Sequence, residues 1–85
     1  SKAQYDKALD NYEKALKIKL KTLGENNPYT ATSYNNIGAV YQSKAQYDKA
    51  LENYEKALII LKNTLGVNHP YVRIVKNNIK KLKNM

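Results

Sequence analysis

The sequence contains no cysteine, no tryptophan and no phenylalanine, and it has only two prolines and three glycines among its 85 residues. Without cysteine the chain forms neither disulfides nor thiolate metal sites, which fits a reducing compartment, and we expect a cytoplasmic location. No apolar run approaches the ~20 residues that a membrane span requires, so no membrane association is expected. A chain of this length is at most one small domain.

Groups that could perform catalysis are scarce. The only histidine, His69, directly precedes Pro70 at a predicted helix start, where a capping or solvent-facing role is favoured over a role as ligand or base. The acidic residues lie three or four positions from lysines on helical segments, a spacing typical of solvated ion pairs. Metal-ligand spacing and a glycine-rich phosphate loop are both missing. We therefore expect a non-enzymatic protein, without catalytic residues, metal ligands or cofactors.

Acidic residues are also few, seven against 15 lysines and arginines, and the net charge is +8. Residues 1–42 carry six lysines and four acids, residues 43–85 carry nine basic residues and three acids, and no acid follows Val72. Such a surface can attract acidic peptides, nucleic acid or anionic lipid. The plainer interpretation, which we favour for the charge alone, is a soluble outer face on a terminal helix.

One segment of the chain occurs twice. Residues 1–16 and 43–58 differ only in Asp10 against Glu52. At the same offset of 42 residues, 25 of 42 aligned positions are identical. Self-similarity at a fixed period of roughly 20–50 residues is typical of stacked repeat architectures.

Apolar residues recur at three- and four-residue steps, which predicts amphipathic helices. Gly24 and Gly66 are suited to end helices, because glycine adopts the left-handed conformation easily. Pro28 and Pro70 are suited to the first helical position, and Asn27 to the N-cap. The predicted helices span about 5–23, 28–42, 47–65 and 70 to near the end.

The two copies diverge at their C-terminal ends. Ile59 and Leu61 replace Lys17 and Lys19, so we expect the third helix to be covered more deeply than the first. In the last helix, three positions that should face a following helix change from Tyr34, Gly38 and Tyr41 to Lys76, Lys80 and Lys83. A repeat array needs a polar outer face on its last element. We thus expect residues 70–85 to be a capping helix, and the N-terminal helix to come from a longer array.

The pattern of aromatic and small residues resembles the tetratricopeptide repeat family. The matching positions are Tyr34, Ile37, Gly38, Tyr41, Tyr47, Ala50, Tyr54, Ala57 and Pro70, with Tyr5, Ala8, Tyr12, Ala15 and Pro28 in the partial first unit. The 42-residue period is similar to that of the kinesin light chain type. The resemblance implies an all-α fold: a fragment of an α-solenoid, with four antiparallel helices in the order B-A-B-A. It forms one domain, 1–85, with repeat units 1–42 and 43–85.

One departure from the family pattern concerns the turn between helices A and B, which usually carries glycine. Here the corresponding residues are Ala3 and Ala45. A left-handed alanine costs roughly 1 kcal/mol or more. The helix could instead continue through this site, which would favour a rearranged or swapped packing.

The resemblance also implies a concave groove, lined by the inner faces of the A helices, that binds a peptide. An asparagine amide both donates and accepts hydrogen bonds, so it can pair with a peptide backbone without reading its sequence. An alternative is that these asparagines are solvated or satisfy neighbouring helix ends. The predicted groove residues are Thr32, Asn35, Asn36, Ala39, Gln42, Ile74, Asn77, Asn78 and Lys81.

The resulting hypothesis is a protein-interaction scaffold that binds a partner peptide, expected to be acidic. A second hypothesis is self-association into a homo-oligomer, because about three repeats are usually needed for stability. The surface predicted for it is the exposed face of the first helix: Tyr5, Leu9, Tyr12 and Leu16. A third is weak polyanion binding by the C-terminal lysines, whereas sequence-specific recognition of nucleic acid is not expected.

Overall fold

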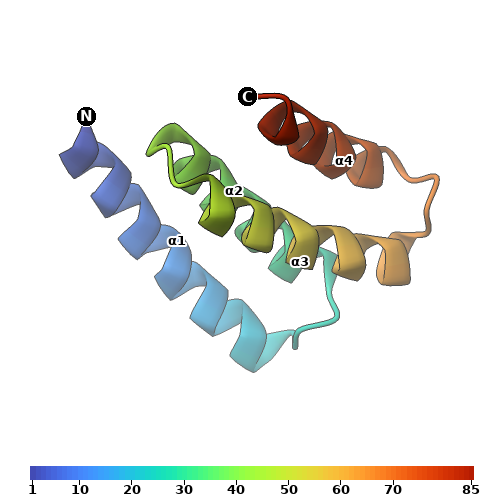
Figure 1. The fold of residues 1–85 in the computed structure, drawn as a ribbon. Coiled ribbons are helices and arrows are strands. Elements are labelled where there is room, and N and C mark those ends of the chain that lie inside the picture. The colour runs from blue at the N-terminus through green and yellow to red at the C-terminus, as the bar shows by residue number, and fades with distance from the viewer.

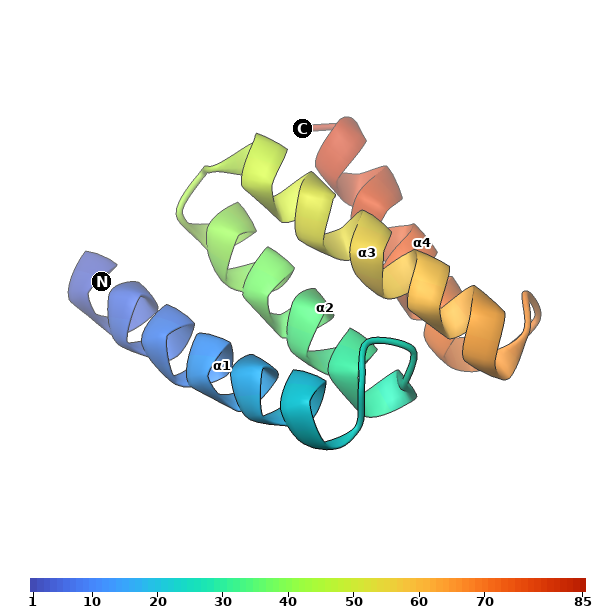
Figure 2. The same cartoon turned by 90° about the horizontal axis from the view of Figure 1, so that it is seen from below.

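The computed structural model describes residues 1–85 as four α-helices (Figure 1). They are α1 (Lys2–Thr22), α2 (Pro28–Ser43), α3 (Tyr47–Leu65) and α4 (Pro70–Lys83). Helices α1, α2 and α3 lie side by side, and α4 packs against α3 from behind in the view of Figure 2. The all-α class and the four predicted helices are thus confirmed. None of the helices combines the length and hydropathy of a membrane-spanning segment.

Helices α2 and α4 begin with the same local arrangement. Proline occupies the first helical position, and the preceding side chain caps the helix. Asn27 Oδ1 accepts a hydrogen bond from the Tyr29 backbone amide at 2.9 Å, and His69 Nδ1 accepts one from the Tyr71 amide at 3.1 Å. The capping role predicted for His69 is therefore confirmed.

The predicted start of α1 is wrong by three residues. The helix begins at Lys2, because Ser1 and Gln4 form a reciprocal capping box at its N-terminus. Ala3 therefore lies inside the helix and not in a turn. The equivalent Ala45 does occupy a turn and has a φ of +60°, as a left-handed site requires.

The glycines act in two ways. Gly24 and Gly66 have φ angles of +83° and +90° and follow the ends of α1 and α3, as predicted. Gly38 lies inside α2, where a Cβ atom would come within 2.7 Å of Tyr54 Cδ1 and 3.2 Å of the Ala50 carbonyl oxygen. Glycine at this position therefore lets the α2 and α3 backbones approach closely.

The hydrophobic core lies between α2, α3 and α4. Helix α3 packs against both of the other two, and α1 packs chiefly against α2. The core consists of small residues, a buried tyrosine ring and aliphatic side chains, which are Ala31, Ala50, Tyr54, Ala57, Ile60, Leu61, Val72, Val75 and Leu82. The ring of Tyr54 is 2% exposed, and its hydroxyl donates to Gln42 Oε1 at 2.7 Å.

Helix α3 is covered more deeply than α1, as predicted. Five of its residues are buried, against only Leu9 in α1. Of the two substitutions that suggested this, Leu61 is 3% exposed, but Ile59 is 60% exposed and contributes nothing to the burial.

Candidate peptide groove

The predicted faces of α2 and α4 meet through a pair of asparagines. Asn78 Nδ2 in α4 donates to Asn35 Oδ1 in α2 at 3.0 Å, and both side chains are partly buried. This hydrogen bond joins residues 43 positions apart in the chain. It also means that each of these amides has already used part of its hydrogen-bonding capacity within the protein.

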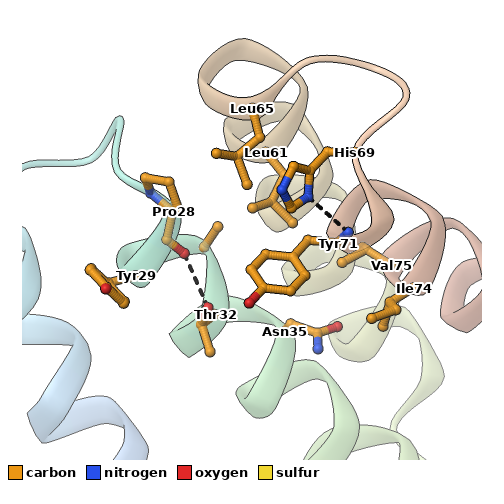
Figure 3. A pocket seen from close by; sticks show the side chains of 11 residues that line it. Pro28, Tyr29, Thr32, Asn35, Leu61, Leu65, His69, Tyr71, Ile74 and Val75 are labelled. Atoms are coloured by element: carbon orange, nitrogen blue, oxygen red, sulfur yellow. Dashed lines mark hydrogen bonds between the residues drawn. The ribbon is translucent and has the colours of Figure 1, made fainter.

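A cavity of about 610 Å³ opens beside this pair, between the N-terminal turns of α2 and α4 (Figure 3). The C-terminal part of α3 contributes two leucines, and the ring of Tyr71 lies in the middle of the view. The lining is mostly apolar, with a few polar atoms that could orient a ligand. Its residues are Pro28, Tyr29, Ala31, Thr32, Asn35, Leu61, Leu65, His69, Tyr71, Ile74 and Val75.

Two tyrosines of this cavity are absent from the predicted site. Tyr29 and Tyr71 are 68% and 52% exposed, each one residue after the proline that starts its helix. A signal for them exists in the sequence, because Pro-Tyr recurs at the 42-residue offset outside the packing stripe. Exposed aromatic residues are enriched in protein interfaces, since their rings provide a large contact area.

The structure brings together part of the predicted groove. Thr32, Asn35 and Ile74 line the cavity, and Asn78 is bonded to one of them. Gln42 lies near the other end of α2, where its amide oxygen accepts the Tyr54 hydroxyl hydrogen. The remaining predicted residues do not line the cavity: Asn36 is half-buried, and Ala39, Asn77 and Lys81 are exposed.

Charge is distributed unequally between the helices. Helix α2 has no charged residue, and α4 has five basic residues and no acid. Helix α3 has three basic and three acidic residues. The N-terminal ends of α2 and α4, which carry partial positive charge from the helix dipole, also border the cavity. The cavity itself is lined by uncharged residues apart from His69, and the excess of positive charge lies on α4, one of the helices that border it.

The surface predicted for self-association is only partly available. Tyr5 and Tyr12 are each 37% exposed, and Leu16 is half-buried. Leu9 is 8% exposed, so its assignment to an exposed face was wrong. It is the single buried residue of a helix that packs chiefly against α2.

The structure contains no group of three or more histidine, aspartate or glutamate side chains that could hold a metal ion. Three of the seven acidic residues form ion pairs with lysines, among them the Asp10–Lys14 and Glu52–Lys56 pairs at 3.1 and 3.7 Å.

Comparison with protein families identifies the architecture. A tetratricopeptide repeat model matches residues 2–63 and 35–83, which together span nearly the whole chain. The chain belongs to the tetratricopeptide repeat family, whose members are protein-interaction modules built from helical hairpins. A comparison with curated proteins finds no match.

Proposed function

We propose that this protein is a non-enzymatic scaffold that binds a segment of a partner protein in the groove between α2 and α4. A peptide backbone would lie along the polar side chains of the two helices, and an apolar side chain would enter the cavity. The observation that carries the proposal is that Thr32, Asn35 and Ile74, three of the residues that the family resemblance assigns to a groove, border one cavity of about 610 Å³.

The proposed partner segment is acidic. Five basic residues on α4 and the absence of any acid on α2 or α4 support this choice. Complementary charge accelerates encounter and excludes basic competitors, while the apolar contacts supply most of the affinity. Cells with a reducing cytoplasm would be a suitable setting for a cysteine-free scaffold of this kind.

The test is fluorescence anisotropy with labelled acidic peptides that carry one central leucine or phenylalanine, measured at low and moderate salt. We expect saturable binding that persists at moderate salt. Tyr71→Ala should weaken it about tenfold, equivalent to about 1.4 kcal/mol for a lost aromatic contact. Tyr47→Ala is the matched control, because Tyr47 is 44% exposed and lies outside the cavity.

Asn77→Ala tests the backbone-binding role separately. The Asn77 side chain is exposed and makes no side-chain hydrogen bond within the protein, so its removal should lower peptide affinity without altering stability. Asn35→Ala is less informative, because it also breaks the bond to Asn78. If both Tyr71→Ala and Asn77→Ala bound the peptide with unchanged affinity, the groove would not be the peptide-binding site. Equal loss of peptide and single-stranded RNA binding with salt would instead indicate non-specific polyanion binding.

Within the family, we propose the kinesin light chain type of repeat. The supporting observation is that positions 42 residues apart have the same local structure at the helix ends. Gly24 and Gly66 both have positive φ, and Pro28 and Pro70 both begin helices.

Self-association through α1 is a second candidate, with another copy of the chain as the occupant. In α3 the residues repeated from α1 are packed between α2 and α4, whereas in α1 the equivalent of the buried Tyr54 is Tyr12, which is 37% exposed. Light scattering at increasing concentration tests it. Tyr12→Lys should prevent the dimer, while Tyr29→Lys should not. A strict monomer at high concentration would contradict this candidate.

A further inference from the structure

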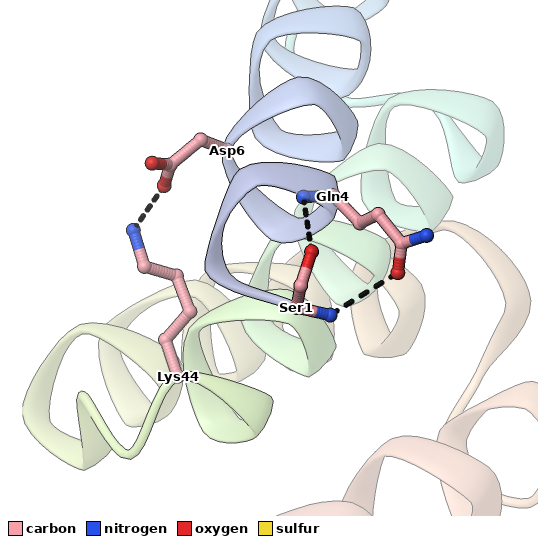
Figure 4. Close-up of polar contacts among 4 residues, drawn as sticks. All are labelled: Ser1, Gln4, Asp6 and Lys44. Atoms are coloured by element: carbon pink, nitrogen blue, oxygen red, sulfur yellow. Dashed lines mark hydrogen bonds and ion pairs between the residues drawn. The ribbon is translucent and has the colours of Figure 1, made fainter.

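The pentapeptide Ser-Lys-Ala-Gln-Tyr occurs at residues 1–5 and at 43–47, and it adopts two different backbones. At 1–5 it starts a helix: the Gln4 amide donates to Ser1 Oγ at 3.4 Å, and the Ser1 amino group donates to Gln4 Oε1 at 3.1 Å (Figure 4). At 43–47 the same five residues end α2, form a turn and start α3. The sequence between α2 and α3 is therefore compatible with a helix.

The turn between α2 and α3 contains a residue in an unfavourable conformation. The Ala45 amide donates to the Gln42 carbonyl at 3.0 Å and the Gln46 amide to the Tyr41 carbonyl at 2.9 Å, the pattern of a Schellman motif. Glycine is usual at the left-handed position of this motif, but here it is Ala45, the only non-glycine residue with positive φ. In addition, Gln46 provides no side-chain cap for α3.

We propose that the segment 44–46 is a hinge that can become helical, so that α2 and α3 join into one continuous helix over 28–65 and two copies exchange halves. Residues 1–43 of one copy would then pack on residues 47–85 of the other. A helix of 38 residues is about 57 Å long, enough to carry the two halves apart. The partner that this structure selects is thus a second copy of the chain.

The exchange conserves the contacts between the halves. Helix α3 of one copy would bury Tyr54 against Gly38 and Gln42 of the other, as it does within the monomer. Lysine, alanine and glutamine are all good helix formers, so the hinge loses little by becoming helical. The strain at Ala45 would be relieved twice in each dimer, and strained short connections favour exchange of this kind. The opposing term is the entropy of association, which makes the exchange dependent on concentration.

The exchange also changes the composition of the groove. In the dimer the hydrogen bond between Asn35 and Asn78 would join two chains, because one residue lies in each half. Each groove would consist of α2 from one copy and α4 from the other, and every dimer would carry two grooves. The dimer would therefore be a bivalent form of the binding module.

The experiment refolds the intact chain from denaturant at low and high protein concentration and separates monomer from dimer by size-exclusion chromatography with light scattering. Ala45→Gly should lower the dimer association constant on the order of 100-fold or more, because glycine relieves strain in the turn and weakens the continuous helix at both hinges. Ala3→Gly is the matched control. It makes the same change in the same local sequence, but α1 is identical in both forms, so the equilibrium should stay within about twofold.

A cross-link distinguishes the exchanged dimer from one formed by contact between α1 faces. The chain has no cysteine, so the double variant Asn35→Cys, Asn78→Cys offers two defined thiols to a short bifunctional maleimide. In an exchanged dimer the linker joins two chains, and a denaturing gel shows a dimer. In a face-to-face dimer it joins residues of one chain, and the gel shows a monomer.

Three results would overturn the proposal: a strict monomer at every refolding concentration, a dimer fraction that Ala45→Gly leaves unchanged, or cross-links confined to single chains. The first two need no cysteine variant, so the proposal can be rejected even if that variant fails to fold. None of these three results bears on peptide binding by the monomer, which the anisotropy experiment measures separately.

Discussion

Helices α1 and α3 are identical at eleven of the twelve aligned positions 5–16 and 47–58, yet they occupy different environments. Tyr12 is 37% exposed and Tyr54 is 2% exposed. Farther along the same helices, the identical Ile18 and Ile60 are 63% and 6% exposed. The difference arises because α3 is packed between α2 and α4, whereas α1 packs chiefly against α2. Equal helical propensity thus coexists with unequal contributions to stability, which come from tertiary packing.

The largest difference in stability is expected for the tyrosine pair, which is Tyr54 in α3 and its equivalent Tyr12 in α1. Tyr54→Ala leaves a cavity and removes the hydrogen bond to Gln42, so we expect a loss of about 3–5 kcal/mol in the free energy of unfolding. Tyr12→Ala should cost less than about 1 kcal/mol, because water already reaches the ring. Urea denaturation followed by circular dichroism measures both. Equal costs would mean that α1 is covered in solution.

A second pair tests the close approach of α2 and α3. Gly38→Ala places a methyl group 2.7 Å from Tyr54 Cδ1, which forces the ring or the helix to move, and overpacking of this kind costs about 1–3 kcal/mol. The gain in helix propensity from glycine to alanine offsets up to about 1 kcal/mol of this.

Lys80 is the control for this substitution, because it is aligned with Gly38 and exposed on α4. Lys80→Ala should change stability by less than about 0.5 kcal/mol in the same urea experiment. A stabilising Gly38→Ala would show that the packing of Tyr54 adapts more easily than the structure implies.

These contrasts also define what the sequence could predict. The starts of α2 and α4 were predictable because proline and the preceding capping residue act locally, and Gly24 and Gly66 mark helix ends in the same way. The start of α1 was not predictable in this way, because the alignment of Ala3 with Ala45 suggested a turn at Ala3. In the structure Ser1 and Gln4 instead form a capping box, and the helix already includes Ala3.

The site was predictable only in part for a similar reason. Helical spacing placed Thr32 and Asn35 on one face of α2, and Ile74 and Asn78 on one face of α4. The cavity depends on how α2 and α4 are positioned by α3, which no local pattern specifies. Its two exposed tyrosines, Tyr29 and Tyr71, were therefore missed, although their repeated Pro-Tyr sequence was visible.

Alkaline pH provides a second test of the tyrosine pair. Burial raises the pKa of Tyr54 above its ordinary value of 10.0, because the phenolate cannot be solvated in the core. The folded state then holds this proton more tightly than the unfolded state. The corresponding stability is complete below pH 10 and is lost as pH rises toward the folded pKa.

Tyr54→Phe removes this group while keeping the ring. We expect it to cost about 0.5–1.5 kcal/mol at neutral pH through the lost hydrogen bond to Gln42, and to lose less stability than the wild type above pH 10. Tyr12→Phe, which removes the hydroxyl at the aligned position of α1, is the matched control. Parallel profiles for the wild type and Tyr54→Phe would show that this hydroxyl does not limit alkaline stability.

The smallest expected effect concerns an aspartate pair at acid pH. Lys44 Nζ lies 2.6 Å from Asp6 Oδ1, joining the turn after α2 to α1, whereas the aligned Asp48 makes no ion pair (Figure 4). The hydrogen bond from Lys44 holds the pKa of Asp6 below its ordinary value of 3.8. The unfolded state therefore binds this proton more readily, so the stability from the contact is present above pH 3.8 and disappears as pH falls through the folded pKa.

Asp6→Asn should lower the unfolding midpoint slightly at neutral pH, with the difference from wild type vanishing in acid. Asp48→Asn is the comparison without an ion pair: Asp48 lies in the first turn of α3, so any cost at neutral pH should come from the helix dipole alone. A persistent difference for Asp6→Asn in acid would assign the effect to helix capping or packing at the start of α1, because an ionised carboxylate could no longer explain it.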